Sequence, residues 1–218
     1  MFDISSGRLF EVAIVLAVML LVAFPVHEFA HALAATRLGD STPRLMGRLT
    51  LDPRAHFDPA GATILAVSMI IGFGIGWAKP TPYNPMNLQG GRWGEAIIAV
   101  AGPISNLVIA IAAAIPLRYI YGTGMDVPFL AGVLQLLVTI NLLLMVFNLI
   151  PIPPLDGSKV LYAFLDPRTG WQVRATLEQY GLLILLGAMF LPIFGGNTLI
   201  GIVVTEVLFP LIRLLTGA

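Results

Sequence analysis

Apolar residues follow one another along this chain in long runs, without the alternation of a half-buried strand or the one-sided stripe of a surface helix. A helix needs about 20 apolar residues to cross a hydrocarbon layer about 30 Å thick. Several runs have roughly that length, and no polar stretch is long enough to form a separate soluble domain. The pattern therefore predicts an all-α, multi-pass membrane protein with five or six spans, at residues 9–38, 61–77, 94–121, 129–149, 177–193 and 199–215.

The run at 61–77 is the least typical of a full crossing, because it is short and carries four glycines. The distribution of basic residues tests whether this run crosses the membrane, since lysine and arginine concentrate in cytoplasmic loops. If the run enters and leaves by one face, ten of the twelve basic residues share one side, and only Arg8 and Arg118 lie opposite. A full crossing would leave a split of seven to five. We therefore predict a re-entrant segment, five true crossings, an outer N-terminus and an inner C-terminus.

The segments on either side of this run have extended rather than helical patterns. Residues 44–52 alternate between leucines and polar side chains, which is the signature of a strand, and residues 79–85 hold three prolines. Together they predict a small membrane-associated β-hairpin or re-entrant region between the first span and the helix containing residues 101–106. We expect one integral membrane domain over 1–218, with a core at 9–165 and two additional C-terminal helices within 177–215.

Composition supports a location in the lipid bilayer and removes other classes of protein. The chain is 57% hydrophobic and 11% charged, with a mean hydropathy of +0.89 and a net charge of zero, so no nucleic-acid partner is expected. The absence of cysteine excludes disulfides and thiolate metal ligands. A cleaved signal peptide is not expected either, because the first run is longer than a signal core and only Arg8 precedes it.

Two histidines and a glutamate interrupt the first run, where ionisable side chains are costly and usually mark function. His27 and His31 are four residues apart, so on a helix they share one face and can offer two imidazoles to one metal ion. Glu28 lies about 100° round the same turn, near enough to exchange protons with water beside that ion. The alternative is a helix that carries these polar residues for packing alone.

A catalytic zinc needs a third protein ligand and an open position. The candidates near apolar runs are His56, Asp156, Asp166 and Glu206. Asp156 follows a segment with three prolines, which ends the helix before it. In the five-crossing topology Asp156 lies at a depth similar to that of His31, whereas six crossings would put the two residues at opposite faces. The metal site and the basic residues therefore favour the same topology, and Glu206 in the last span is left without a role.

These motifs resemble those of the site-2 proteases, a family of intramembrane zinc metallopeptidases. That family pairs a His-Glu-x-x-His helix with a later Asn-x-x-Pro segment that ends in Asp-Gly, and residues 27–31 and 148–157 match these two elements. Residues 101–106 resemble the family's Ala-Gly-Pro helix start. Residues 76–85 resemble a short subgroup of bacterial and archaeal members, so we expect the short form without an appended PDZ or CBS domain.

The resemblance implies that His27, His31 and Asp156 bind one Zn²⁺ per chain and that Glu28 is the general base. It implies an endopeptidase that cleaves transmembrane or membrane-tethered proteins, as in regulated intramembrane proteolysis. The site would then face the cytoplasmic side of a prokaryotic plasma membrane. An inactive relative that acts as a chaperone or scaffold, and a metal transporter, are the alternatives.

Three further polar residues have two interpretations each. Asn148 either binds a substrate strand and stabilises the oxyanion, or makes a polar contact at a helix end. Asn106 either contacts the substrate or joins two helices. His56 either touches the site or is a structural hydrogen-bonding residue near the membrane surface.

Overall fold

The computed structural model describes residues 6–71, 74–192 and 196–217. Helices, turns and irregular segments make up this part of the chain, and it contains no β-strand. Five of its helices are long and apolar enough to cross a membrane, in agreement with five of the six apolar runs. They cover Leu9–Arg37, Arg92–Thr123, Pro128–Asn148, Gly170–Phe190 and Leu199–Thr216.

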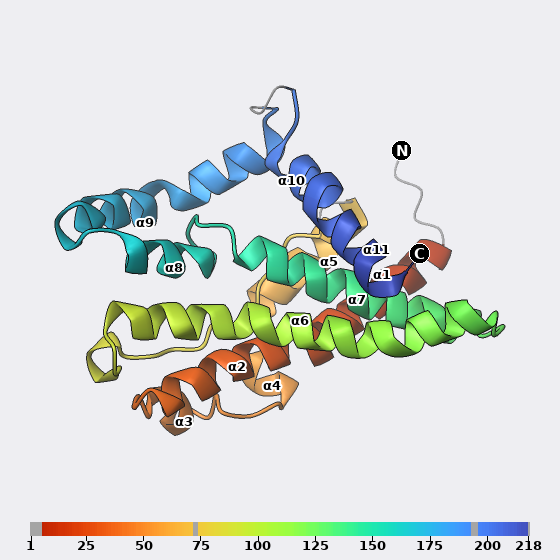
Figure 1. Ribbon diagram of the computed structural model, residues 1–218, viewed down its shortest axis with the longest axis horizontal. Coiled ribbons are helices and arrows are strands. Elements are labelled where there is room, and N and C mark those ends of the chain that lie inside the picture. Colours follow the sequence, from red (N-terminus) through yellow and green to blue (C-terminus); the bar gives the residue numbers. More distant parts are fainter. Residues whose placement is uncertain (1–5, 72–73, 193–195, 218) are drawn as a thin grey trace.

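The first and last spans are each a continuous rod, in which a π-helical segment joins two α-helices (Figure 1). The second and third spans form an antiparallel hairpin that turns at Gly124, whose backbone is left-handed. The α-helices of the spans are α1 (Ser6–Val18), α2 (Phe24–Arg37), α6 (Arg92–Thr123), α7 (Pro128–Asn148), α9 (Pro167–Phe190), α10 (Leu199–Ile202) and α11 (Phe209–Thr216). The π-helical segments are Met19–Ala23 and Val203–Leu208.

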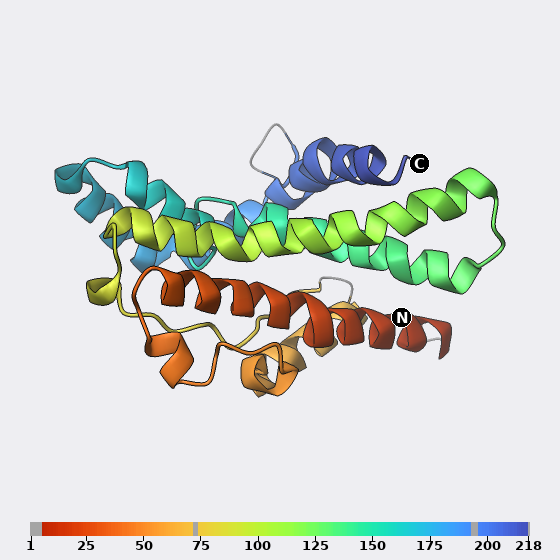
Figure 2. The ribbon, with the colours of Figure 1, turned by 60° about the horizontal axis from the view of Figure 1, so that its bottom comes forward.

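α6 lies at the centre of the packing, between α2 and α7, and it also contacts the short helix α8 (Gly157–Phe164) (Figure 2). Its buried side chains toward α7 and the last span are mostly small, with Ala110, Ala113 and Ala114 beside Leu117. Small residues let helix backbones approach closely, which stabilises helix pairs in a membrane, where burial from water supplies little. The centre of the molecule is therefore rigid enough to position side chains from α2 and α8.

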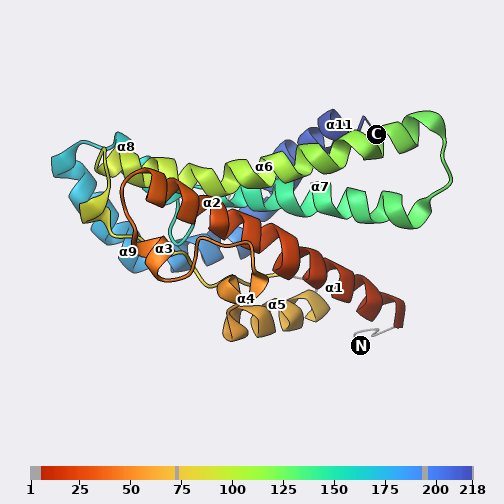
Figure 3. The ribbon, with the colours of Figure 1, turned by 90° about the horizontal axis from the view of Figure 1, so that it is seen from below.

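The run at 61–77 contains a short helix, α5 (Pro59–Ile71), and the chain after it turns back. The backbone N–H of Lys79 donates to the carbonyl of His56 at 2.9 Å, so the two ends of the segment between these residues lie side by side. Gly61 and Trp77 are in such close contact that a Cβ atom at position 61 would overlap the Trp77 carbonyl. Figure 3 shows α5 beside α1, on the side of the first span away from α6 and α7. This arrangement agrees with a re-entrant segment.

The prediction of a strand at 44–52, and of a β-hairpin there, is wrong. Residues Thr42–Leu45 form the helical turn α3, residues Pro53–His56 form α4, and the chain between them is irregular. The alternating leucines do not face a core, since Leu45 is 83% exposed and Leu51 is 55% exposed. The pattern therefore reflects apolar side chains on the outer surface of a loop, without a partner strand to pair with.

The C-terminus lies at the end of the molecule opposite to the one predicted. α9 starts beside the first turn of α6, where Arg174 is 3.9 Å from Glu95. α11 ends beside the last turns of α6, where Arg118 donates to the carbonyl of Leu214 at 3.3 Å. α1 begins and α11 ends toward the α6–α7 turn (Figure 1). The prediction that Arg118 and Arg213 occupy opposite sides is wrong, because the last span runs along α6 in the same direction.

Candidate metal centre

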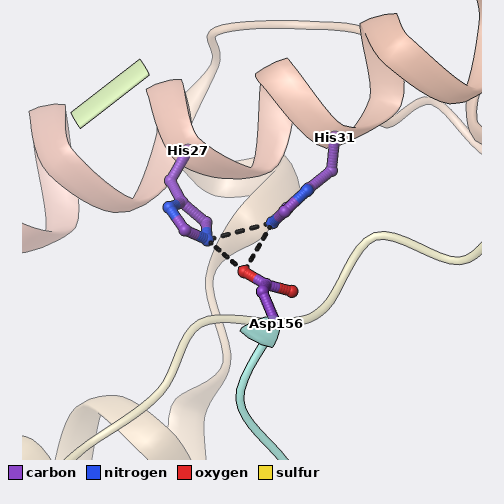
Figure 4. A group of neighbouring side chains, drawn as sticks. All are labelled: His27, His31 and Asp156. Carbon is purple, nitrogen blue, oxygen red and sulfur yellow. Dashed lines mark hydrogen bonds and ion pairs between the residues drawn. The ribbon is translucent and has the colours of Figure 1, made fainter. Parts of the chain in front are cut away.

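Three ligand atoms from two distant parts of the chain converge at one point (Figure 4). His27 and His31 project from successive turns of α2, and Asp156 precedes the first residue of α8. The Nε2 atoms of the two histidines are 3.0 Å apart, and Asp156 Oδ2 lies 3.2 Å and 3.1 Å from them. All three side chains are buried. The structure thus brings together the three residues for which the sequence predicts metal binding.

The geometry of this cluster suits a zinc ion. Bonds of about 2.0–2.1 Å in a tetrahedron place neighbouring ligand atoms about 3.3 Å apart, close to the three separations observed. Two imidazoles and one carboxylate form the ligand set of a catalytic zinc site, which keeps a fourth position for water or substrate. His27, His31 and Asp156 are the residues that would hold the ion.

Hydrogen bonds behind the two imidazoles fix which nitrogen faces the ion. His27 Nδ1 donates to Asn106 Oδ1 at 2.6 Å, and His31 Nδ1 donates to the carbonyl of Ile98 at 2.6 Å. Because both acceptors are oxygens, the proton of each ring lies on Nδ1 and the lone pair of Nε2 points into the cluster. Asn106 is in turn oriented by Asn141, since Asn106 Nδ2 donates to Asn141 Oδ1 at 2.9 Å.

Two glycines allow close backbone packing at the cluster, one beside the histidines and one beside the end of α7. A Cβ atom at position 102 would lie 2.5 Å from His31 Nε2 and 2.6 Å from His27 Nε2. A Cβ atom at Gly157 would overlap the carbonyl of Leu149, where the chain folds back after α7. The Ala-Gly-Pro and Asp-Gly motifs therefore have a steric role in assembling the cluster, which can be inferred from the sequence only when the helix partners are known.

The carboxylate of Asp156 remains charged in this environment. Burial raises the pKa of Asp156, but the polar contacts with His27 and His31 and the positive charge of Lys159 outweigh burial and hold that pKa well below its usual range. Lys159 Nζ lies 3.4 Å from Asp156 Oδ1, on the side away from the imidazoles. One carboxylate oxygen thus faces the histidines and the other faces a lysine, so the group is anchored from both sides.

Glu28 is half-buried on the neighbouring face of α2 and does not belong to the group of three converging ligand atoms. Its Oε2 accepts a hydrogen bond from the backbone N–H of Thr81 at 2.7 Å. Thr81 also donates a hydrogen bond from its hydroxyl to the backbone carbonyl of Glu28, at 3.0 Å. Residue 81 lies in the proline-rich segment after the re-entrant run, and the sequence alone did not identify this contact.

The other predicted site residues lie around the cluster in different roles. Asn106 is fully buried behind His27. Asn148 donates to the carbonyl of Leu144 within α7, which is the contact expected of a polar residue at a helix end. His56 is buried and bonds to the carbonyl of Thr50, outside the group of three ligand atoms. Glu206 is exposed on the surface of the last span and accepts a bond from Thr205.

A cavity of about 260 Å³ lies beside Lys159, where the first turn of α6 meets α8 and the start of α9. Arg92 crosses its edge to the carbonyl of Leu165 at 2.6 Å. Its lining residues are Arg92, Glu95, Lys159, Tyr162, Leu165, Asp166, Gly170, Trp171 and Arg174.

Comparisons with known proteins agree with this geometry. The model of peptidase family M50 matches residues 116–192, a range that includes Asp156. YwhC of Bacillus subtilis, provisionally named a zinc metalloprotease, is 36% identical over 184 residues, which cover 82% of this chain and 81% of that protein. Rip2 of Mycolicibacterium smegmatis, named in the same way, is 32% identical over 172 residues, which cover 79% of this chain and 65% of that protein.

A third relative is longer than this chain. Rip3 of Mycobacterium tuberculosis, also provisionally named a zinc metalloprotease, is 35% identical over 160 residues, and the match spans 33% of its length. No solved structure matches the chain. The similarity to YwhC extends over most of both proteins, and the chain has five helices able to cross a membrane together with a His-His-Asp group. The chain therefore belongs to peptidase family M50, the site-2 protease family, and is a membrane-embedded metallopeptidase whose cofactor is zinc.

Proposed function

We propose that this protein is an endopeptidase that cleaves transmembrane or membrane-tethered proteins near the cytoplasmic face of the cell membrane. The observation that carries the proposal is the position of the ligand cluster. His27 and His31 lie inside the first apolar span, and Asp156 lies just beyond the end of α7. A peptide bond could reach this point from the bilayer or from its inner surface, whereas a folded soluble protein could not.

The charge distribution supports the cytoplasmic side. Arg92, Lys159 and Arg174 surround the cavity at the cluster's end of the molecule, and Arg37 ends α2 at the same end. Arg118 lies at the other end, beside the end of α11. Because basic residues concentrate in cytoplasmic loops, this distribution supports a cytoplasmic position for the end with the cluster.

The chain's own residues supply the proton transfers and the orientation in the proposed reaction. Bound zinc would lower the pKa of a water molecule to about 7 and polarise the scissile carbonyl. Glu28 accepts a proton from the attacking water through its carboxylate and then gives that proton to the departing amide nitrogen as the C–N bond breaks. Asn106 and the Ile98 carbonyl keep the histidine rings in one orientation throughout. A helical substrate must unwind first, since its amides are otherwise bonded within the helix.

The two alternative functions lack support of this kind. A metal transporter needs a series of polar sites along a path. In the part of the chain that the structure describes, His27, His31 and Asp156 form the only group of three or more converging histidine, cysteine or acidic side chains. An inactive scaffold would not need Glu28 beside a complete ligand set. We therefore favour catalysis over both.

A cleavage assay with a single-span model substrate in detergent or vesicles tests the proposal. The zinc-loaded protein should cleave it, a chelator should stop cleavage, and added zinc should restore it. Glu28→Gln should keep bound zinc and lose cleavage by about 10²–10⁴-fold, because the amide cannot accept the proton. Wild-type turnover in Glu28→Gln would contradict the mechanism, and cleavage that survives complete removal of zinc would contradict the function.

A further inference from the structure

The segment after the re-entrant run has an unusual distribution of backbone donors. Proline has no N–H, so in the sequence Pro80-Thr81-Pro82 only Thr81 can donate a backbone hydrogen bond. Pro80 fixes its own φ, and Pro82 restricts Thr81 to extended conformations. The direction of the single N–H is therefore largely set by the sequence.

That N–H points at the carboxylate of Glu28. Thr81 N lies 2.7 Å from Glu28 Oε2, and Thr81 Oγ1 lies 3.0 Å from the Glu28 carbonyl oxygen. Two bonds between the same pair of residues fix both the side chain and the backbone of Glu28 relative to the segment. The bond to the amide occupies Oε2, so the oxygen that accepts a proton from water would be Oε1.

Buried groups hold the segment on both sides of Thr81. On one side, Lys79 N donates to the His56 carbonyl at 2.9 Å, and the buried Arg48 donates through Nη1 to the Lys79 carbonyl at 3.3 Å. On the other side, Asn84 N donates to Oδ2 of the fully buried Asp40 at 2.7 Å. The Thr81 amide is thus a fixed part of the framework, rather than the tip of a free loop.

We propose that Thr81 is a positioning residue for catalysis, whose backbone amide holds the Glu28 carboxylate in the orientation needed for proton transfer. This inference rests on the proposed role of Glu28 as general base. A hydrogen bond to a carboxylate is stronger than one between neutral groups, and a group held within about 0.5 Å of its working position loses little rate to misalignment. The amide acts through Glu28 and does not touch the reacting atoms.

Amide hydrogen exchange tests the contact without any measurement of activity. Within residues 80–82 of the intact protein, Thr81 has the one exchangeable backbone amide, because its two neighbours are prolines. In Glu28→Ala the exchange rate of this amide should rise about 10-fold or more, because its acceptor is gone. In Glu28→Gln the rise should be smaller, since a neutral acceptor remains. The Asn84 amide, bonded to Asp40, should not change and serves as the internal control. Equal exchange of the Thr81 amide in wild type and Glu28→Ala would overturn the proposal.

Two substitutions at the same position test the catalytic consequence. Thr81→Pro removes the amide donor and Thr81→Val keeps it while removing the hydroxyl. Thr81→Pro should lower kcat by about 10–100-fold, with KM and zinc content little changed. Thr81→Val should lower kcat by clearly less than Thr81→Pro does. An equal loss in both variants, or a higher kcat in Thr81→Pro, would overturn the proposal. If Thr81→Pro fails to retain zinc, the exchange experiment decides. Wild-type cleavage by Glu28→Gln would instead contradict the proposed function itself.

Discussion

At the scale of single residues, the spacing of two histidines on a helix indicates a metal site but does not say how the rings are held. Here each ring is oriented by an oxygen behind it, from Asn106 for His27 and from the Ile98 backbone for His31. A backbone carbonyl leaves no trace in a sequence, and Asn106 could be read equally well as a substrate contact. The three residues that converge could thus be predicted, whereas most of the groups that orient them could not.

Replacement of Asn106 by alanine should weaken zinc binding without removing a ligand. The His27 ring would lose the acceptor that fixes its tautomer, and loss of such a partner typically costs about 10–100-fold in metal affinity. Competition with a chelator of known affinity measures this change. Asn148→Ala is the matched control, because the Asn148 amide bonds only within α7, to Leu144, among the contacts described. Equal zinc affinity in Asn106→Ala and wild type would contradict the role assigned to Asn106.

Replacement of Asp156 tests the third ligand directly. Asp156→Asn removes the charge that faces the two histidines, so zinc content should fall by more than the loss caused by Asn106→Ala. His56→Ala should keep its zinc, because His56 lies outside the ligand group. The measurement is metal per chain after dialysis. A full zinc complement in Asp156→Asn, together with a loss of zinc in His56→Ala, would show that His56 rather than Asp156 is the third ligand.

At the scale of elements, hydropathy was sufficient for the long helices and insufficient for the segments between them. The five helices long enough to cross a membrane follow from runs of apolar residues whose length matches a bilayer. The loop at 44–52 has the period of a strand, but a strand needs a partner. Pro43 and Pro53 bound this loop, and the Arg48 guanidinium bonds to the carbonyls of Ala55 in α4 and of Lys79 after the run at 61–77. Periodicity cannot distinguish a core-facing leucine from one on the outer surface of a loop.

Asp40 joins the loop after α2 to the segment that carries Thr81, and its substitution should destabilise this connection. Burial raises the pKa of Asp40, but bonds from Thr42, the Asn84 amide and Asn87 lower it by more, so the folded protein holds this carboxylate charged. Asp40→Asn replaces an acceptor oxygen with a donor beside these donors. Unfolding free energy in detergent should fall by about 1–3 kcal/mol.

The same carboxylate predicts a dependence of stability on pH. Because the pKa of Asp40 is lower in the folded than in the unfolded protein, its contribution is complete above the ordinary aspartate pKa of about 3.9 and is lost as the pH falls below that value through the folded pKa. Thermal unfolding of wild type between pH 6 and pH 3 should therefore show a fall that is reduced in Asp40→Asn. Parallel curves for the two proteins would show that Asp40 does not contribute this difference.

At the scale of the whole molecule, the bias of basic residues predicts a re-entrant segment, with which the backbone agrees, but it did not predict the direction of the last span. The prediction of a re-entrant segment depends on many charges, since seven basic residues change sides if the run at 61–77 crosses. The prediction of the last span's direction depends on Arg213 alone among the basic residues of that span. Packing determines this direction instead, because Leu208 lies among the small buried side chains of α6, Ala110, Ala113 and Ala114. Such a contact between distant helices has no counterpart in a count of charges.

Cysteine labelling can determine the topology of the intact protein in vesicles, since the chain has no native cysteine. Ser41 and Gln89 should react with an impermeant thiol reagent from one face, because Gln89 N bonds to the carbonyl of Leu38 and the two loops lie together. Thr123 should react from the opposite face. The structure adds Gly217, which lies against Arg118 near the end of α6, so a cysteine there should respond with Thr123 and not with Ser41. Labelling of positions 41 and 89 from opposite faces would exclude the re-entrant segment. Labelling of position 217 together with 41 would restore five alternating crossings and show that the last span packs along α6 in the reverse direction.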